Sequence, residues 1–255
     1  MRARRLLLAL VLAFAGAGTA AATPITPDLA MSVQTLDPSG TTTLSYGLAD
    51  VGTCTPNADG VSGSCSASYH DLGLFILRSW GSGYSDPFVT NNFTVLNNSG
   101  FTQIYDFTVT LPLGSPVGPQ TNMSGSVGLT VTNNNDASAT IADTGSAIYQ
   151  ALIDGSPVQS LFSPASSVFC PPSGSAPFCS TSNSAQFGIN PNPPVLGPQA
   201  NSSIAIHIRF SLTPGDQAGV TSVFNVDAVP EPMTVVMMGL GLLGLGVAGR
   251  SRRAD

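Results

Sequence analysis

The segment Ser203-Ile-Ala-Ile-His-Ile-Arg-Phe-Ser-Leu212 alternates apolar and mostly polar residues with a period of two. Its apolar set is Ile204, Ile206, Ile208, Phe210 and Leu212, and Ala205, His207, Arg209 and Ser211 stand between them. Successive side chains of a strand point to opposite faces, so the segment is predicted to be a half-buried strand. The turn sequence Thr213–Asp216 follows, and the in-phase apolar residues of Val220–Val226 suggest an antiparallel partner strand.

The same alternation recurs through the middle of the chain. Further candidate strands are Tyr105–Leu111, Val127–Thr132, Leu72–Trp80, Phe88–Leu96 and Ala147–Ile153. Gly, Asn and Pro separate them, and no helical period intervenes. The pattern predicts an all-β fold over residues 23–228, a single antiparallel β-sandwich or jelly-roll-like domain. Leu72–Trp80 is almost continuously apolar, which predicts burial on both faces or a crossing between sheets.

Residues 163–199 depart from this pattern because they contain eight prolines. Proline lacks the amide donor that a sheet ladder needs, so this segment is not expected to form a central strand. We expect a long loop or Pro-rich insertion on the sandwich, with a binding loop as the alternative.

Charged residues are scarce and unevenly distributed. The 255-residue chain has no Lys and a single Glu, Glu231, and residues 23–229 contain two Arg and twelve Asp, a formal charge of −10. Phosphate binding needs a basic surface, so nucleic acid is excluded as a partner. The lack of Lys and Glu, which favour helix, argues against a helical bundle.

The first 22 residues have the organisation of a secretory signal peptide. Arg2, Arg4 and Arg5 precede the apolar run Leu6–Ala15, and small residues end the segment at Ala22. The apolar run is too short to cross a hydrocarbon core of about 30 Å, so an uncleaved anchor is the weaker interpretation.

The last 27 residues form a second tripartite segment. Val229-Pro230-Glu231-Pro232 precedes the uncharged stretch 233–249, and Arg250, Arg252 and Arg253 follow. Seventeen residues at 1.5 Å each span roughly 26 Å, which predicts a short transmembrane helix. The arginines act as a cytoplasmic stop signal, so the body is expected outside the inner membrane.

Residues 229–255 resemble the PEP-CTERM sorting domain of Gram-negative bacteria in the order, spacing and placement of these three parts. The resemblance implies that exosortase, a membrane cysteine transpeptidase, recognises Pro230, Glu231 and Pro232 and cuts nearby. It also implies an inner-membrane-anchored precursor that is later released or attached at the cell surface. A plain tail anchor is the alternative interpretation.

The four cysteines all lie in the exported portion, where disulfides are permitted. Three pairings are formally available, and loop-closure entropy favours the local one, Cys54 with Cys65 and Cys170 with Cys179. A zinc site is less favoured because the spacings lack a C-x2-C knuckle.

No recognisable catalytic constellation occurs in the sequence, so we expect no enzyme activity, no cofactor, no catalytic residue and no metal ligand. Three features keep alternatives open. His70 beside Asp71 would need a nearby Ser to act as a hydrolase, whereas His207 is expected to be an ordinary exposed imidazole. Asn133–Asp136 could hold calcium but is better explained as a solvated turn. Trp80 could stack on a sugar.

Together these features predict an exported structural or adhesion protein of the cell surface or extracellular matrix. A carbohydrate-binding module is the alternative, with exopolysaccharide as its ligand, and a secreted hydrolase is a third class. The inner membrane would be a transient partner through the C-terminal helix.

Overall fold

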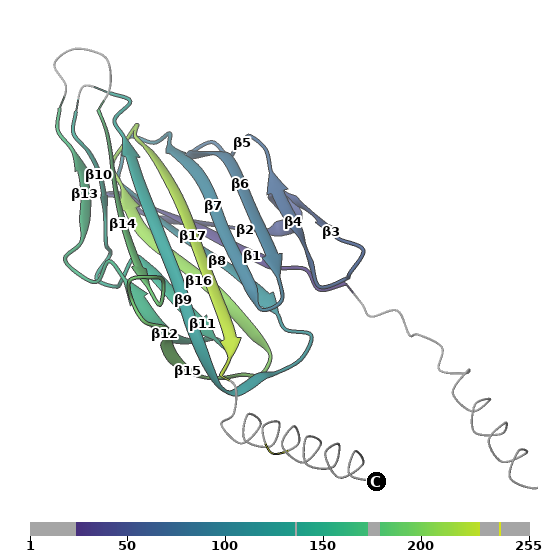
Figure 1. Cartoon of the computed structure of the whole chain (residues 1–255). Helices are drawn as coiled ribbons and strands as arrows, with labels where there is room; N and C mark the ends of the chain where they lie inside the picture. The colour runs from purple at the N-terminus through teal and green to yellow at the C-terminus, as the bar shows by residue number, and fades with distance from the viewer. Residues whose placement is uncertain (1–23, 136, 173–178, 230–239, 241–255) are drawn as a thin grey trace, which may run out of the picture.

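A computed structural model describes residues 24–135, 137–172, 179–229 and 240 of the chain. They fold into two antiparallel sheets packed face to face, and the nine-stranded sheet lies in front in Figure 1. The predicted antiparallel β-sandwich is therefore confirmed. Among the described residues, no helix combines the length and apolar composition that a membrane crossing requires.

The eight-stranded sheet has the order β12-β11-β16-β8-β1-β2, and β10 joins it by pairing with β16 and β13. Its strands are β1 (Asp28–Asp37), β2 (Gly40–Gly47), β8 (Gln103–Pro112), β10 (Ala139–Ala142), β11 (Tyr149–Ile153), β12 (Ser156–Leu161), β13 (Ser167–Cys170) and β16 (Ser203–Leu212). A single helical turn, α2 (Leu48–Val51), follows β2.

The nine-stranded sheet has the order β14-β9-β17-β7-β6-β4-β3, with β15 paired to β9 and β5 paired to β6. Its strands are β3 (Thr53–Pro56), β4 (Ser62–Ala67), β5 (His70–Asp71), β6 (Phe75–Ser85), β7 (Phe88–Asn97), β9 (Val117–Thr132), β14 (Ser180–Phe187), β15 (Val195–Ala200) and β17 (Gln217–Ala228). Its long strand β9 pairs along one side with β17, and along the other with β14 and then β15.

The core lies between the two sheets and is built on aromatic side chains. The rings of Phe93 on β7 and Phe107 on β8 stack across the interface with centroids 3.9 Å apart. Tyr105 and Phe210 stack within the eight-stranded sheet at 5.4 Å, and the Tyr105 hydroxyl donates to Gln103 Oε1 at 2.7 Å. These rings are buried because the alternation of each strand directs one apolar face inward.

Strand β16 has the bounds predicted from its alternation, but its expected partner was wrong. β16 pairs with β8, β10 and β11, whereas β17 belongs to the opposite sheet and pairs with β7 and β9. The turn at residues 213–216 therefore crosses between sheets. An apolar face can be buried against a facing sheet as well as beside a paired strand, and alternation alone does not distinguish these arrangements.

The Pro-rich segment 163–199 also differs from the expected long loop, because it contributes β13, β14 and β15. β13 and β14 contain no proline, and β15 accommodates Pro198 beside a shift in its register with β9. All three strands lie at sheet margins, where a missing amide donor is tolerated.

The apolar run at residues 72–80 begins its strand only at Phe75. A register shift between Leu77 and Ser79 marks a bulge in β6, and Phe75, Ile76 and Leu77 are buried in succession. These three residues precede the bulge and pair with β7 in unbroken register, so their side chains alternate between the two faces of the sheet. The predicted burial on both faces is therefore confirmed here, and β6 does not cross between sheets.

Candidate functional site

The sorting residues predicted from the sequence lie outside the described residues, as does the signal peptide 1–22. Of the helix predicted at 233–249 only Leu240 is described, and it is helical. The sorting residues outside the described ranges are Pro230, Glu231 and Pro232, with Arg250, Arg252 and Arg253. The structure does place the residue that precedes them. β17 ends at Ala228, and the Val229 amide donates to the Gln120 carbonyl at 3.0 Å. The sorting tripeptide therefore follows directly on a residue that is hydrogen-bonded to the sandwich.

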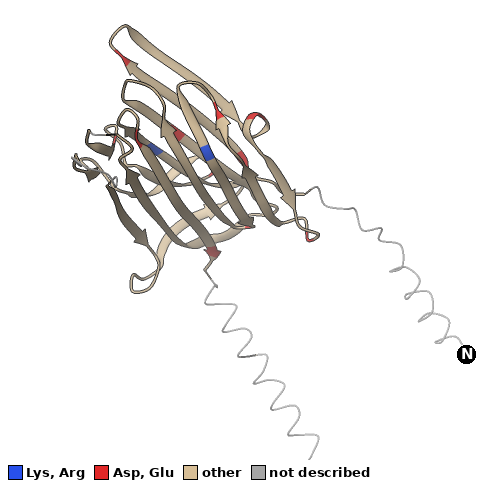
Figure 2. Cartoon of the chain, turned by 90° about the horizontal axis from the view of Figure 1, so that it is seen from above, with Lys and Arg blue, Asp and Glu red and all other residues tan. Residues whose placement is uncertain are grey.

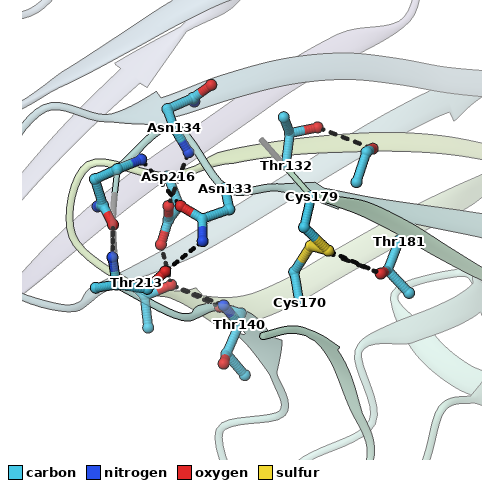
Figure 3. Close-up of a disulfide and its surroundings, with 12 residues drawn as sticks. Thr132, Asn133, Asn134, Thr140, Cys170, Cys179, Thr181, Thr213 and Asp216 are labelled. Carbon is cyan, nitrogen blue, oxygen red and sulfur yellow. Dashed lines mark hydrogen bonds between the residues drawn. A yellow bond between two sulfur atoms is a disulfide. The ribbon is translucent and has the colours of Figure 1, made fainter. Parts of the chain in front are cut away.

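Both cysteine pairs form the local disulfides favoured by loop closure. Cys54 and Cys65 oppose each other directly in the β3–β4 ladder, and Cys170 at the end of β13 bonds Cys179 just before β14. Figure 3 shows the second disulfide beside Thr181, on the margin of the nine-stranded sheet. The two bonds close loops at opposite margins of that sheet, so they stabilise the domain and are not free thiols.

Asn133 and Asn134 lie at the end of the sandwich beside this disulfide (Figure 3). Asn133 is fully buried and its side-chain amide donates to the Ala137 carbonyl, so the expected solvated turn was wrong at this position. Asp216, also fully buried, accepts from the Thr213 hydroxyl at 2.6 Å and from the Asn134 amide at 3.3 Å.

Burial raises the pKa of Asp216, and the two hydrogen bonds only partly oppose it. No group of three or more His, Cys, Asp or Glu side chains suited to a metal occurs in the described ranges. The side chains of Asn133 and Asn135 donate to main-chain carbonyls of neighbouring loops, and Asn134 donates its main-chain amide to Asp216, so all three serve to hold the loops together. Asp136, the fourth residue of the proposed calcium segment, is outside the described residues.

The residues proposed for a hydrolase are not joined in the structure. The Asp71 carboxylate accepts the Gly73 amide at 2.9 Å within a turn, and no hydrogen bond connects it to His70 in the part of the chain that the structure describes. Trp80 is buried, and its ring N–H donates to Asn91 Oδ1 at 3.0 Å, so its ring is not available for stacking on a sugar.

A cluster that the sequence analysis missed lies on the outer face of the eight-stranded sheet, where β8 and β16 run side by side. Asp106 accepts from His207 Nε2 at 2.9 Å and from Arg209 Nη1 at 3.0 Å, one bond to each carboxylate oxygen. His207 Nδ1 lies 3.1 Å from Gln150 Oε1, and Arg209 Nε donates to Thr144 Oγ1 at 3.0 Å. His207 is thus half-buried and partnered, not an ordinary exposed imidazole.

Partial burial opposes ionisation of Asp106, but the hydrogen bond from His207 and the charges of His207 and Arg209 outweigh it and lower the pKa of this carboxyl. Because both ring nitrogens of His207 are occupied, the ring is not free to take a proton from a nucleophile. The register that sets Arg209 opposite Asp106 brings the cluster together. The sequence signal for this cluster was Asp106 on the polar face of one strand and Arg209 on the polar face of another.

The outer face of the nine-stranded sheet carries a shallow groove of about 560 Å³ that crosses five strands. Apart from four buried apolar residues, Trp80, Phe93, Leu129 and Val220, its lining consists of small uncharged side chains and glycines. Two adjacent cross-strand rows floor it: Gly81, Asn92, Thr221, Gly128 and Ser184, and Ser79, Thr94, Gly219, Thr130 and Ser182. Glycine at three of these positions removes the side chain that would otherwise fill the depression, so an extended polar surface results.

Comparison with known proteins gives one family match. Residues 228–253 match the PEP-CTERM protein-sorting motif. No curated protein sequence matches the chain. The match confirms the resemblance noted at the C-terminus and identifies an exported protein whose C-terminal signal is processed by exosortase.

Proposed function

Because the chain carries a PEP-CTERM protein-sorting motif, we propose that it is a structural or adhesion protein of the cell surface or extracellular matrix. The precursor is held in the inner membrane by residues 233–249, and exosortase cuts near Pro230–Pro232 and frees the body for release or attachment. The β-sandwich then acts by display and not by catalysis.

The proposal rests on the hydrogen bonds that the polar side chains make within the domain. Hydrogen-bond partners within the domain are present for Asp106, His207 and Asp216, and Asp71 accepts a main-chain amide within its own turn. A general base or nucleophile needs an atom that is free to meet substrate, and these groups are engaged in stabilising loops and strand pairs. Such a domain supports a passive role as a rigid, disulfide-stabilised surface module.

The sorting step is tested by replacing Pro230, Glu231 and Pro232 with Ala in a full-length, epitope-tagged chain expressed in a Gram-negative host that has exosortase. The wild type is expected at the surface of intact cells, where antibody and added protease reach it. The variant is expected in the membrane fraction as the larger precursor. Replacement of the exposed pair Pro193 and Pro194 is the matched control and should leave sorting unchanged.

Two results would contradict the proposal. Normal surface release of the triple variant would remove exosortase from the pathway. A wild-type protein that is sorted correctly but stays out of reach of external antibody would remove the display role.

The groove on the nine-stranded sheet favours a second candidate, binding of a neutral polysaccharide. Hydroxyl and amide side chains at Asn92, Thr94, Thr130 and Thr221 match the hydrogen-bonding groups of sugars, and the absence of charge among the lining residues favours an uncharged chain. The buried Trp80 contributes no stacking, so recognition rests on hydrogen bonds.

Immobilised neutral and anionic polysaccharides distinguish these functions when they are tested with calcium and with a chelator. The second candidate expects saturable binding to a neutral polymer, independent of calcium, and Thr221→Arg should abolish it by filling the groove. Thr43→Arg, on the exposed strand β2, is the control. Absence of binding to every polymer would leave display as the function.

A further inference from the structure

The margins of the two sheets differ in how they are protected from pairing with another chain. β12 carries Pro157 beside a register shift in its ladder with β11, and β15 carries Pro198 beside a shift of its own. β3 has only four residues, ends in Pro56 and is tied to β4 by a disulfide. Prolines, bulges and short length are the devices by which natural sheets prevent edge-to-edge association.

Strand β14 has none of these devices. Its eight residues, Ser-Thr-Ser-Asn-Ser-Ala-Gln-Phe, contain no proline and no charge, and they pair with β9 in one uninterrupted register from Ser180 opposite Thr132 to Phe187 opposite Gly125. Within the described residues, β14 pairs with β9 alone. Its other side therefore presents a row of backbone amide and carbonyl groups ready to accept a further strand.

Charge favours a second copy of the chain as that further strand. Two bodies of formal charge −10 repel each other, so they approach most easily where charge is absent. The sequence contains no Asp, Glu, Lys or Arg between Asp154 and Arg209, a stretch that includes β14. In Figure 2 the few acidic residues leave long uncharged stretches of sheet.

The other long unblocked edge strand, β2, lies in a different electrostatic setting. Asp37 directly precedes its hairpin turn, and Asp50 in α2 accepts the amide of Gly47 at the other end of the strand. Like charges at both ends of β2 oppose its pairing with an identical edge. β14 is the better candidate for self-association.

We propose that the exported body forms a two-fold symmetric dimer in which the β14 strands of two copies pair antiparallel and join the two nine-stranded sheets into one. Such a two-fold axis is perpendicular to the sheet, so a residue at the axis lies opposite its own symmetry mate. Seven of the eight β14 residues can pair only if the axis passes through Asn183 or Ser184. In both registers the outward-facing Ser182 and Ser184 stay on one continuous face.

This geometry makes cysteine substitution a direct test in the full-length chain exported by an exosortase-containing host. The four native cysteines form disulfides, so an introduced thiol is the only free one. Directly opposed residues in an antiparallel pair have Cβ atoms about 4.5–5.5 Å apart, close to the reach of a disulfide. Under mild oxidation, Asn183→Cys or Ser184→Cys should give a covalent dimer as the main species on a non-reducing gel.

Thr221→Cys is the matched control, because Thr221 is exposed on the same sheet but lies on β17 between two paired strands. It should remain monomeric.

A second experiment uses the double variant Ser182→Lys with Ser184→Lys, which sets like charges opposite each other across the axis. Both side chains are exposed, so the subunit should fold, as fluorescence of the buried Trp80 will report.

Sedimentation of the processed protein should show a dimer for the wild type and at least tenfold weaker association for the double lysine variant. The proposal is overturned if both cysteine variants cross-link no more than Thr221→Cys, or if the lysine variant associates as tightly as the wild type. A ladder of higher oligomers would also overturn it, because a closed two-fold contact stops at two copies. None of these outcomes depends on the surface location tested above.

Discussion

Replacement of Asp154 by Asn tests whether one exposed carboxylate ties two turns of the eight-stranded sheet together. Asp154 lies in the turn between β11 and β12 with a positive φ of 50°, which Asn tolerates well. Its Oδ2 accepts the amide and side-chain N–H of Asn201 at 2.9 and 3.0 Å. Its Oδ1 accepts the Ser202 amide, the Ser202 hydroxyl and the Ser203 amide at 2.8, 2.9 and 3.1 Å.

Asparagine can replace only one of the two oxygens, so the two Asn201 donors would face an amide group that cannot accept. Each net hydrogen bond contributes about 0.5–1.5 kcal/mol. Since Asp154 is exposed, screening by solvent reduces this, and we expect a loss of about 1–2 kcal/mol in the free energy of unfolding. For a domain of this size the melting temperature should fall by roughly 3–6 °C.

The stability difference between wild type and Asp154→Asn should depend on pH, in a direction set by the lowered pKa of Asp154. The little burial that Asp154 has opposes ionisation, but the donors of Asn201, Ser202 and Ser203 dominate and hold the pKa of this carboxyl well below its ordinary value of 3.8. The stabilisation is therefore fully present above that ordinary value and is lost as the pH falls through the lowered one. The difference between wild type and variant should be constant from pH 7 to pH 5 and shrink below pH 4.

Urea unfolding followed by fluorescence of Trp80 measures this difference, because the only tryptophan of the chain is buried in the folded state. Asp28→Asn, at an exposed position on β1, removes the same charge and should change stability by less than about 0.5 kcal/mol. Equal stability of Asp154→Asn and wild type at pH 7, or a difference that does not change on acidification, would refute the reasoning.

Three further substitutions test other parts of the domain by the same unfolding measurement. Phe107→Ala removes a buried ring stacked on Phe93 and should cost about 3–5 kcal/mol; a cost below 1 kcal/mol would contradict the packing described. Burial raises the pKa of Asp216, so ionisation of this carboxyl lowers the stability of the wild type as the pH rises. The stability advantage of Asp216→Asn over the wild type should therefore grow between pH 3 and pH 7, and an advantage that falls over this range would be inconsistent with the raised pKa. Replacing Cys170 and Cys179 together by Ser opens a loop of sequence separation 9 and should cost roughly 2–3 kcal/mol, and an unchanged midpoint would show that the bond does not form.

The polar clusters have a common character that bears on function. Asp106 with His207 and Arg209 crosses two strands of one sheet, while Asp216 with Thr213 and Asn134 joins loops at one end of the sandwich. In both places the polar atoms bind each other or the backbone. The charged groups of these two clusters therefore stabilise the domain itself, whereas no charged residue lines the groove on the nine-stranded sheet.

The sequence by itself determined the class of the fold and the route of the protein. Alternation with a period of two depends only on neighbouring residues, so the bounds of β16 could be read from residues 203–212. The sorting motif at residues 228–253 is likewise a linear signal, read by order and spacing. The local disulfides followed from loop length, which is also a property of the linear chain.

Only the tertiary structure decided which strands are neighbours. Three features depend on contacts between residues far apart in the sequence: the assignment of β16 and β17 to opposite sheets, the register that places Asp106 beside Arg209, and the position of β14 at the end of its sheet among the described strands. An apolar strand face is stabilised by packing against any apolar surface, because the hydrophobic effect is not directional. The choice among partners is made by the packing of the whole domain.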